Sequence, residues 1–202
     1  MVDIIDNSGH SMRDMSSRSH VSSTQPDWSR ERKSGFFSWD PPRSLIASVR
    51  AYQKHANAGG LLGGCLRRFA VLRHRFWSVV TGADVPLNCS FEGGLLLPHP
   101  NGIVLHPEVR IGPNCMIFQQ VTLGMAKAQV PTIGGHVDIG AGARVLGAIH
   151  IGDHCVIGAN AVVLVDMPPW SVATGVPATI RPREDRPRGY EQDKGGNDRS
   201  AP

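Results

Sequence analysis

A histidine between two prolines interrupts a largely apolar stretch of this 202-residue chain. His99 stands between Pro98 and Pro100, ahead of Asn101–Gly102, in the run LLLPHPNGIVLHPEVRIG. The Asn-Gly pair predicts a turn, because both residues tolerate a positive φ. An imidazole in such a turn can pack, bind a metal ion or move a proton, since its charge changes near neutral pH. The surrounding elements decide which of these uses is open to it.

Those elements follow a six-residue repeat. Aliphatic anchors recur at every sixth position in two runs, separated by ten residues: Leu105, Ile111, Ile117 and Leu123, then Ile133, Ile139, Val145, Ile151, Ile157 and Val163. A glycine often follows the anchor, and a small or branched residue stands four positions after it. Six is the period of hexapeptide repeats in parallel β-helices, and fits neither a helix nor an ordinary hairpin. The repeat therefore predicts a β-solenoid.

In that solenoid each hexapeptide forms one side of a triangular coil, so eighteen residues complete a turn. Leu105 is then expected to stack on Leu123, Ile133 on Ile151, and Ile139 on Ile157. The break in the repeat, GMAKAQVPT, predicts a loop that leaves the prism, and such loops often carry function. An isolated prism buries limited surface for each residue, which favours an oligomer.

The domain organisation follows from composition. Residues 1–40 are rich in Ser, Arg and Asp, and we expect a disordered tail. Residues 41–82 form a helical segment, in which one helix starts at Pro41–Pro42 and a second is closed by Gly82. The β-helix covers 83–180, and a flexible charged tail covers 181–202.

Charge is unevenly distributed along the chain. The net charge is +4, but the stretch 41–80 contains seven Lys or Arg residues and no acid. A solvated face or a contact between copies is expected there, with weak contact between residues 61–80 and an anionic membrane surface as the alternative. No nucleic-acid partner is expected. The four cysteines form no CxxC pair and the N-terminus lacks a secretory pattern, so we expect reduced thiols in a cytoplasmic protein.

The quoted motifs resemble a known family. GADVPLNCSFEGGLLLPHPNGIVL, CMIFQQVTLG, IGAGARVLG, IGDHCVIGANAVVL and ATGVPATI are similar to the catalytic domain of serine O-acetyltransferase and of its sugar-acetylating relatives, in the hexapeptide acyltransferase superfamily. The resemblance covers residues 82–183. It implies a mainly β fold, a left-handed parallel β-helix preceded by short α-helices. It also implies acetyl-CoA as co-substrate and a homotrimer.

The resemblance assigns roles to individual residues. His99, in HPNGIV, takes the place of the family's general base, and Asp84, in GADVP, that of the aspartate which orients it. An alcohol needs such a base to attack a thioester at neutral pH. Main-chain contacts to acetyl-CoA are implied at Gly124, Ala141 and Ala159, and charge contacts with its phosphates at Lys127, Arg181 and Arg183.

Departures from the family pattern affect the acceptor. The aspartate that usually precedes the histidine is Pro98 here, and Val130 stands where the extruded loop of serine acetyltransferases carries a second histidine. The chain also lacks the C-terminal isoleucine with which those enzymes dock on a partner, and its helical segment is short, which favours a simple trimer. These differences favour a sugar or polysaccharide precursor as acceptor, with L-serine as the alternative.

Two other classes of protein remain open. A γ-type carbonic anhydrase shares the β-helix and would hold zinc through histidines such as His99, His136 and His150, but their spacing lacks a close histidine pair. We therefore expect no metal. A non-catalytic hexapeptide scaffold is the second alternative.

Overall fold

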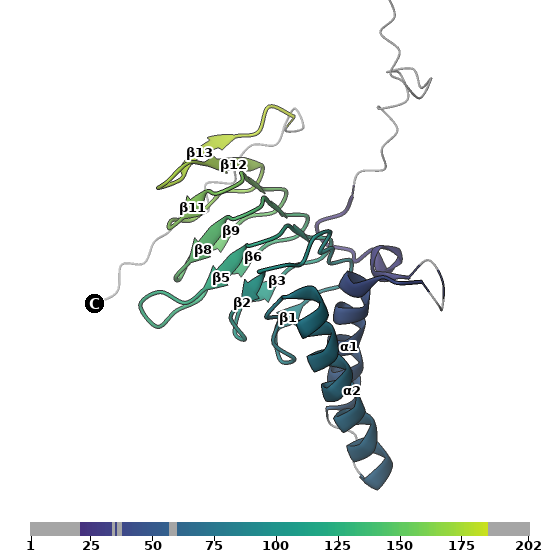
Figure 1. Ribbon diagram of the computed structural model, residues 1–202. Coiled ribbons are helices and arrows are strands. Elements are labelled where there is room, and N and C mark those ends of the chain that lie inside the picture. Colours follow the sequence, from purple (N-terminus) through teal and green to yellow (C-terminus); the bar gives the residue numbers. More distant parts are fainter. Residues whose placement is uncertain (1–20, 34, 36–37, 57–59, 186–202) are drawn as a thin grey trace, which may run out of the picture.

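The computed structural model describes residues 21–33, 35, 38–56 and 60–185. It is mainly β, as predicted: a parallel solenoid with two helices at one end (Figure 1). The solenoid strands are short, and they run as β1 Ser90–Phe91, β2 Val104–Leu105, β3 Arg110–Ile111, β4 Met116–Ile117, β5 Thr122–Gly124, β6 Thr132–Ile133, β7 Asp138–Ile139, β8 Arg144–Leu146, β9 His150–Ile151, β10 Val156–Ile157, β11 Val162–Val163, β12 Ser171–Thr174 and β13 Thr179–Pro182.

Three sheets form the sides of the prism. Their strand orders are β1-β3-β6-β9, β13-β12-β10-β7-β4 and β11-β8-β5-β2, and every pair is parallel except β12 with the C-terminal strand β13. Leu105 pairs with Leu123, Ile133 with Ile151, and Ile139 with Ile157. The stacking predicted from the eighteen-residue coil is therefore confirmed.

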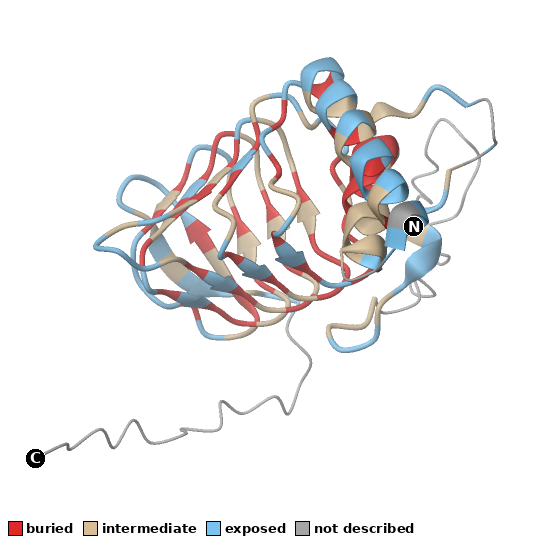
Figure 2. Cartoon of the chain, turned by 90° about the horizontal axis from the view of Figure 1, so that it is seen from below, coloured by how far each residue is buried: buried red, intermediate tan, exposed pale blue. Residues whose placement is uncertain are grey.

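The core is the inside of the coil. Along each strand an outward residue precedes a buried anchor, and all ten predicted anchors are at most 2 % exposed. Figure 2 shows buried residues alternating with more exposed ones along the solenoid. Burying one such aliphatic side chain stabilises the fold by about 1.5–3 kcal/mol. The narrow interior also holds Cys115, Cys155 and Ala161, which are fully buried.

The glycines after the anchors let successive coils approach each other. A Cβ on Gly112 would lie 2.7 Å from the carbonyl oxygen of Gly134 in the next coil. A Cβ on Gly140 would lie 2.7 Å from the backbone nitrogen of Ala159. Both distances are too short for a side chain, so the repeat requires glycine there.

The helices close the first coil. α1 (Pro41–His55) begins after Asp40, whose carboxylate accepts a hydrogen bond from the Arg43 N–H at 3.2 Å. Its residues Leu45, Ile46 and Val49 are buried in the solenoid core. α2 (Gly60–Thr81) ends at Gly82, which has a φ of +64°. No helix among the described residues has the length and hydropathy that a membrane crossing requires.

The N-terminal residues differ in part from the expected tail. Residues 1–20 lie outside the described residues, but residues 21–33, here called the N-terminal strap, lie along the solenoid and include a 3₁₀ helix at Trp28–Glu31. Glu31 accepts hydrogen bonds from the N–H groups of Gly94 and Leu95 and pairs with Arg50. A few polar contacts hold this segment, which apolar periodicity does not reveal.

The C-terminal end also extends past the expected boundary. β13 continues to Pro182, and the Arg183 guanidinium donates to the carbonyl of His154 at 2.8 Å. Residues 186–202 lie outside the described residues.

Candidate active site

The turn that carries His99 is longer than the regular turns of the solenoid. Phe91 pairs with Ile111, twenty residues on, whereas Ile133 pairs with Ile151, eighteen residues on. The coil with the PHPNG turn thus has two extra residues. His99 is exposed at the surface of this enlarged turn.

Asp84 lies on the backbone segment next to this turn. The Gly102 N–H donates to the carbonyl of Gly82 at 2.8 Å. The main-chain carbonyl of Asp84 accepts from the Leu105 N–H, and the Asp84 N–H donates to the carbonyl of Ile103. The structure therefore brings the two predicted catalytic segments side by side, at the N-terminal end of the solenoid. Among the described residues, neither the His99 ring nor the Asp84 carboxylate makes a side-chain hydrogen bond, so their pairing stays a prediction.

Sequence reasoning missed a second imidazole near Asp84. His74 of α2 is buried, with Nδ1 3.2 Å from the Ser48 hydroxyl and Nε2 3.4 Å from the Ser78 hydroxyl. Burial lowers the pKa of His74, and the charge of Asp84 partly opposes this by raising it. The Asp84 carboxylate thus acts electrostatically on His74 of α2. No repeat or motif marks His74, because it lies outside the hexapeptides.

Two of the predicted acetyl-CoA contacts share one corner of the prism with His99. Along this corner Gln120 donates to the carbonyl of Asn101, Gly142 to that of Gln119, and Asn160 to that of Ala141, at 2.8–2.9 Å. Ala141 and Ala159 immediately precede Gly142 and Asn160 in these turns. We call this stack of turns the His99 corner. Its turns at Ala141 and Ala159 carry small side chains, and the Gln119–Gln120 turn lies between them and the His99 turn.

The other predicted contacts lie elsewhere. Gly124 ends β5, at the opposite end of the strand from Gln120, and the exposed Lys127 lies in the loop that follows. Arg181 is exposed on β13, where it pairs with Val172. Arg183 is engaged by Asp185 and lies over the Trp170 ring. One copy of the chain therefore does not bring all the predicted contacts together.

A cavity of about 330 Å³ adjoins the His99 turn. It lies between the start of α1 and the strand that leads to Pro98, and its walls include Trp39, Asp40, Arg43 and Ile46. The Asp40 carboxylate and the Arg43 guanidinium lie 2.8 Å apart at its edge. Sequence reasoning missed this cavity, because it assigned residues 39 and 40 to a disordered tail.

No metal centre is formed in the described part of the chain. There, no three His, Cys, Asp or Glu side chains cluster closely enough to hold an ion. His136 instead contacts His154, with 2.8 Å between their Nδ1 atoms, and His150 lies on β9. A larger hollow of about 740 Å³, over β1, β3, β6 and β9, contains none of the predicted site residues.

Comparisons with known proteins agree with this arrangement. No family model matches the chain. It is 35 % identical to a serine acetyltransferase of Mycobacterium tuberculosis over 136 residues, which is 65 % of this chain and 59 % of the relative. It is 32 % identical to that of Escherichia coli K12 over 164 residues, 78 % of this chain and 60 % of the relative. The chain thus spans less than two thirds of the curated relatives it matches.

Solved structures give the same result. A serine acetyltransferase in complex with CoA is similar at a TM-score of 0.57 and 34 % identity, covering 68 % of this chain and 55 % of that one. The serine acetyltransferase of Neisseria gonorrhoeae is similar at a TM-score of 0.61 and 32 % identity, covering 72 % and 56 %. The fold is the left-handed β-helix of the acyltransferases.

The hexapeptide repeat, the coil register and these similarities support the hexapeptide acyltransferase superfamily. Within that superfamily, the proteins that it is similar to are serine acetyltransferases. The leaning of the sequence analysis toward the sugar-acetylating relatives is not supported. It rested on single departures near Pro98 and Val130, whereas the similarity extends over most of the described chain.

Proposed function

We propose that the chain is an acetyl-CoA-dependent O-acetyltransferase whose acceptor is L-serine. The observation that carries this proposal is the His99 corner, where an exposed imidazole shares a stack of small-residue turns with Ala141 and Ala159, beside the Asp40–Arg43 cavity. The serine acetyltransferases with similar sequences and folds support the same activity.

In the proposed reaction His99 acts as general base. Its neutral imidazole accepts the proton of the acceptor hydroxyl as the oxygen attacks the thioester carbonyl. The tetrahedral intermediate then collapses, the C–S bond breaks, and the imidazolium returns the proton to the leaving CoA thiolate. Asp84, on the adjacent segment, stabilises the imidazolium. Aligning the hydroxyl with the thioester supplies much of the remaining acceleration.

The cavity next to His99 fits a small zwitterion. The Asp40 carboxylate and the Arg43 guanidinium pair with each other at 2.8 Å, and a serine zwitterion would exchange this pair for contacts of its ammonium group with Asp40 and of its carboxylate with Arg43. A neutral sugar hydroxyl would need neither charge. This pair therefore supports an amino acid over a sugar, although the loop lacks the histidine that serine acetyltransferases carry there.

We also propose that the active unit is a trimer in the cytoplasm. Gly124 and Lys127 lie at the C-terminal end of β5, and the His99 corner lies at its N-terminal end. A neighbouring copy in a cyclic assembly can present its loop to this corner, which would complete a groove for acetyl-CoA.

The test measures acetyl-CoA turnover by the full chain with L-serine and with several sugars as acceptors. The release of the CoA thiol is the readout. His99→Ala should lower kcat by about 10²–10⁴-fold. His106→Ala is the matched control, because His106 lies in the next turn and accepts from the Glu108 N–H at 3.2 Å. Undiminished turnover in His99→Ala would show that His99 is not the base.

Asp40→Asn tests the acceptor separately. Asparagine caps a helix as well as aspartate does, so α1 should be kept while the charge is lost. We expect a higher KM for L-serine and an unchanged KM for acetyl-CoA. Turnover with a sugar but not with L-serine would contradict the proposed acceptor and leave acetyl transfer intact.

A further inference from the structure

Helix α2 exposes a continuous apolar face. Seven large apolar side chains on this 22-residue helix lie at the surface, spaced three or four residues apart or adjacent: Leu62, Leu66, Phe69, Leu72, Phe76, Val79 and Val80. Phe69 is 64 % exposed and Val79 is 83 % exposed. Positions with this spacing share one side of a helix. We call them the α2 stripe.

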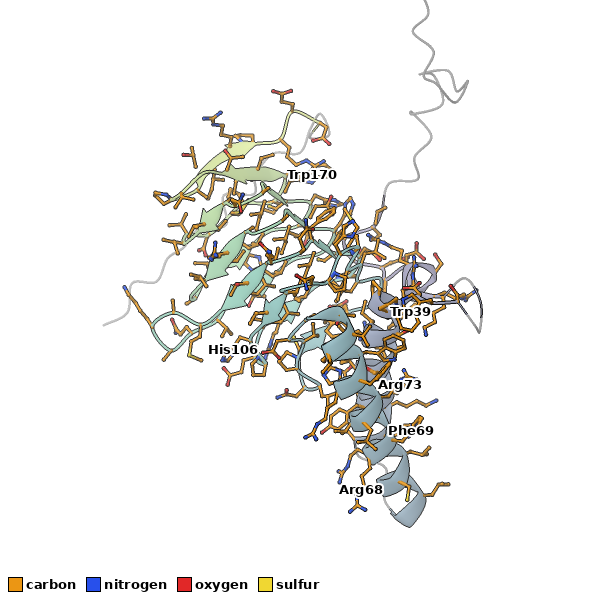
Figure 3. All side chains as sticks on the ribbon, in the orientation of Figure 1. Trp39, Arg68, Phe69, Arg73, His106 and Trp170 are labelled. Carbon is orange, nitrogen blue, oxygen red and sulfur yellow. The ribbon has the colours of Figure 1, made fainter. Side chains whose placement is uncertain are left out.

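The fold of one copy does not need the α2 stripe. α2 buries a different side, which includes Ala70, His74 and Thr81, and His74 meets Ser48 of α1 there. In Figure 3 Arg73, Phe69 and Arg68 follow one another along the part of α2 that extends away from the solenoid. Exposed apolar patches of this kind mark interaction sites.

The positive charge around the α2 stripe favours a partner with negative charge. Arg68 and Arg75 are exposed, and each lies four residues before a stripe residue, Leu72 and Val79. The two arginines therefore lie at the rim of the stripe, where long side chains can reach outward while their stems cover apolar surface. Arg73 lies nearby, and its Nε is buried without a hydrogen-bond partner among the described residues.

No acid balances these arginines within the two helices. Residues 41–80 contain seven Lys or Arg side chains and no Asp or Glu. Two copies that met through the same face would bring like charges together, which costs free energy. A layer of anionic headgroups provides both the countercharge and the apolar boundary beneath it.

We propose that the α2 stripe docks on the surface of an anionic lipid bilayer, with α2 lying in the plane of the interface. The stripe enters the boundary between headgroups and acyl chains, and Arg68 and Arg75 bind lipid phosphates. The solenoid stays in the aqueous phase. This docking is independent of the proposed acetyl transfer.

The experiment is sedimentation of the full chain with two kinds of vesicle, phosphatidylcholine alone and phosphatidylcholine mixed with phosphatidylglycerol. Binding to the mixed vesicles and not to the neutral ones is expected, and it should weaken as salt rises. Arg68→Gln with Arg75→Gln should lower the partition coefficient by at least about tenfold, given the usual contribution of each basic residue near an anionic surface. Phe69→Ser with Leu72→Ser should abolish binding.

Matched control variants make the same kinds of substitution on the solenoid. Arg110→Gln with Arg144→Gln deletes two exposed charges, and Leu164→Ser with Val165→Ser deletes two exposed apolar side chains. Both should bind like the parent chain. All altered residues are solvent-exposed, and circular dichroism checks that each variant folds.

Two results would overturn the proposal. The first is equal binding to both kinds of vesicle, or to neither. The second is a smaller particle mass of Phe69→Ser with Leu72→Ser in light scattering without lipid, because the stripe would then be a contact between copies.

Discussion

Asn114 holds the N-terminal strap on the solenoid, and replacing it should release the strap. Its side chain is fully buried, Nδ2 donates to the carbonyls of Ser22 at 2.7 Å and Gln25 at 2.8 Å, and Oδ1 accepts from the Asp27 N–H at 2.8 Å. The backbone of Asn114 has a φ of +61°, which asparagine tolerates better than alanine.

The expected cost of Asn114→Ala follows from these contacts. Three hydrogen bonds contribute about 1 kcal/mol each, and alanine at positive φ costs about 1 kcal/mol more, which gives about 4 kcal/mol. Asn114→Gly loses the same bonds without the steric term, so its cost should be smaller by up to about 1 kcal/mol. Of these contributions, opening of the strap removes only the three hydrogen bonds, so their loss, about 3 kcal/mol, raises its open population about 150-fold, while the steric cost lowers the stability of the whole solenoid.

Limited trypsin digestion measures that opening, because the strap contains Arg30 and Arg32. Cleavage there should be fast in both Asn114→Ala and Asn114→Gly, and slow in the parent chain. Asn160→Ala is the control, since Asn160 has a φ of +58° on a different corner of the solenoid. If Asn160→Ala and Asn114→Ala release the strap at equal rates, the hydrogen bonds of Asn114 do not hold it.

Two further predictions concern titratable groups in the core. Burial raises the pKa of Cys89 and Cys155 to about 11 and that of Cys115 to about 12. Iodoacetamide at pH 8 should therefore label only the exposed Cys65 of the folded chain and all four thiols after unfolding, as counted by mass spectrometry. Labelling of Cys115 in the folded chain would contradict its burial. Burial also raises the pKa of Asp138 above 3.8, against the opposing charges of Arg30 and Arg183, so the protonated form is the stabilising one in the fold. The free energy of unfolding should thus fall as pH rises through the folded pKa of Asp138, and Asp138→Asn should remove that fall in denaturant titrations; an unchanged pH dependence would refute this.

The residues that face the inside of the solenoid were predictable, because a short repeating sequence pattern determines them. Each anchor such as Ile139 or Ile151 repeats the same offset from its glycine, and a narrow prism accepts only aliphatic or small groups at those positions. The start of α1 was also predictable, since the prolines at its first turn are a short-range signal.

The N-terminal strap and the cavity beside His99 were not predictable in this way. The strap depends on Asn114 and Glu31, which meet partners far away in the chain, and the cavity forms where the start of α1 packs against residues 95–98. Asn114 lies 87 residues from Asp27, and no periodic pattern links two such positions. His74 was missed for the same reason, because only packing places it near Asp84.

By itself, therefore, the sequence determined that the chain coils, which side chains face inward, and where a loop leaves the coil. Only the tertiary structure decided which turns share a corner. The two extra residues of the His99 turn and the inserted loop change the spacing from eighteen to twenty and twenty-two residues in the first coils. The corner at which a residue lies depends on how many residues have been inserted before it. Ala141 and Ala159 therefore lie at the same corner as His99, and Gly124 does not.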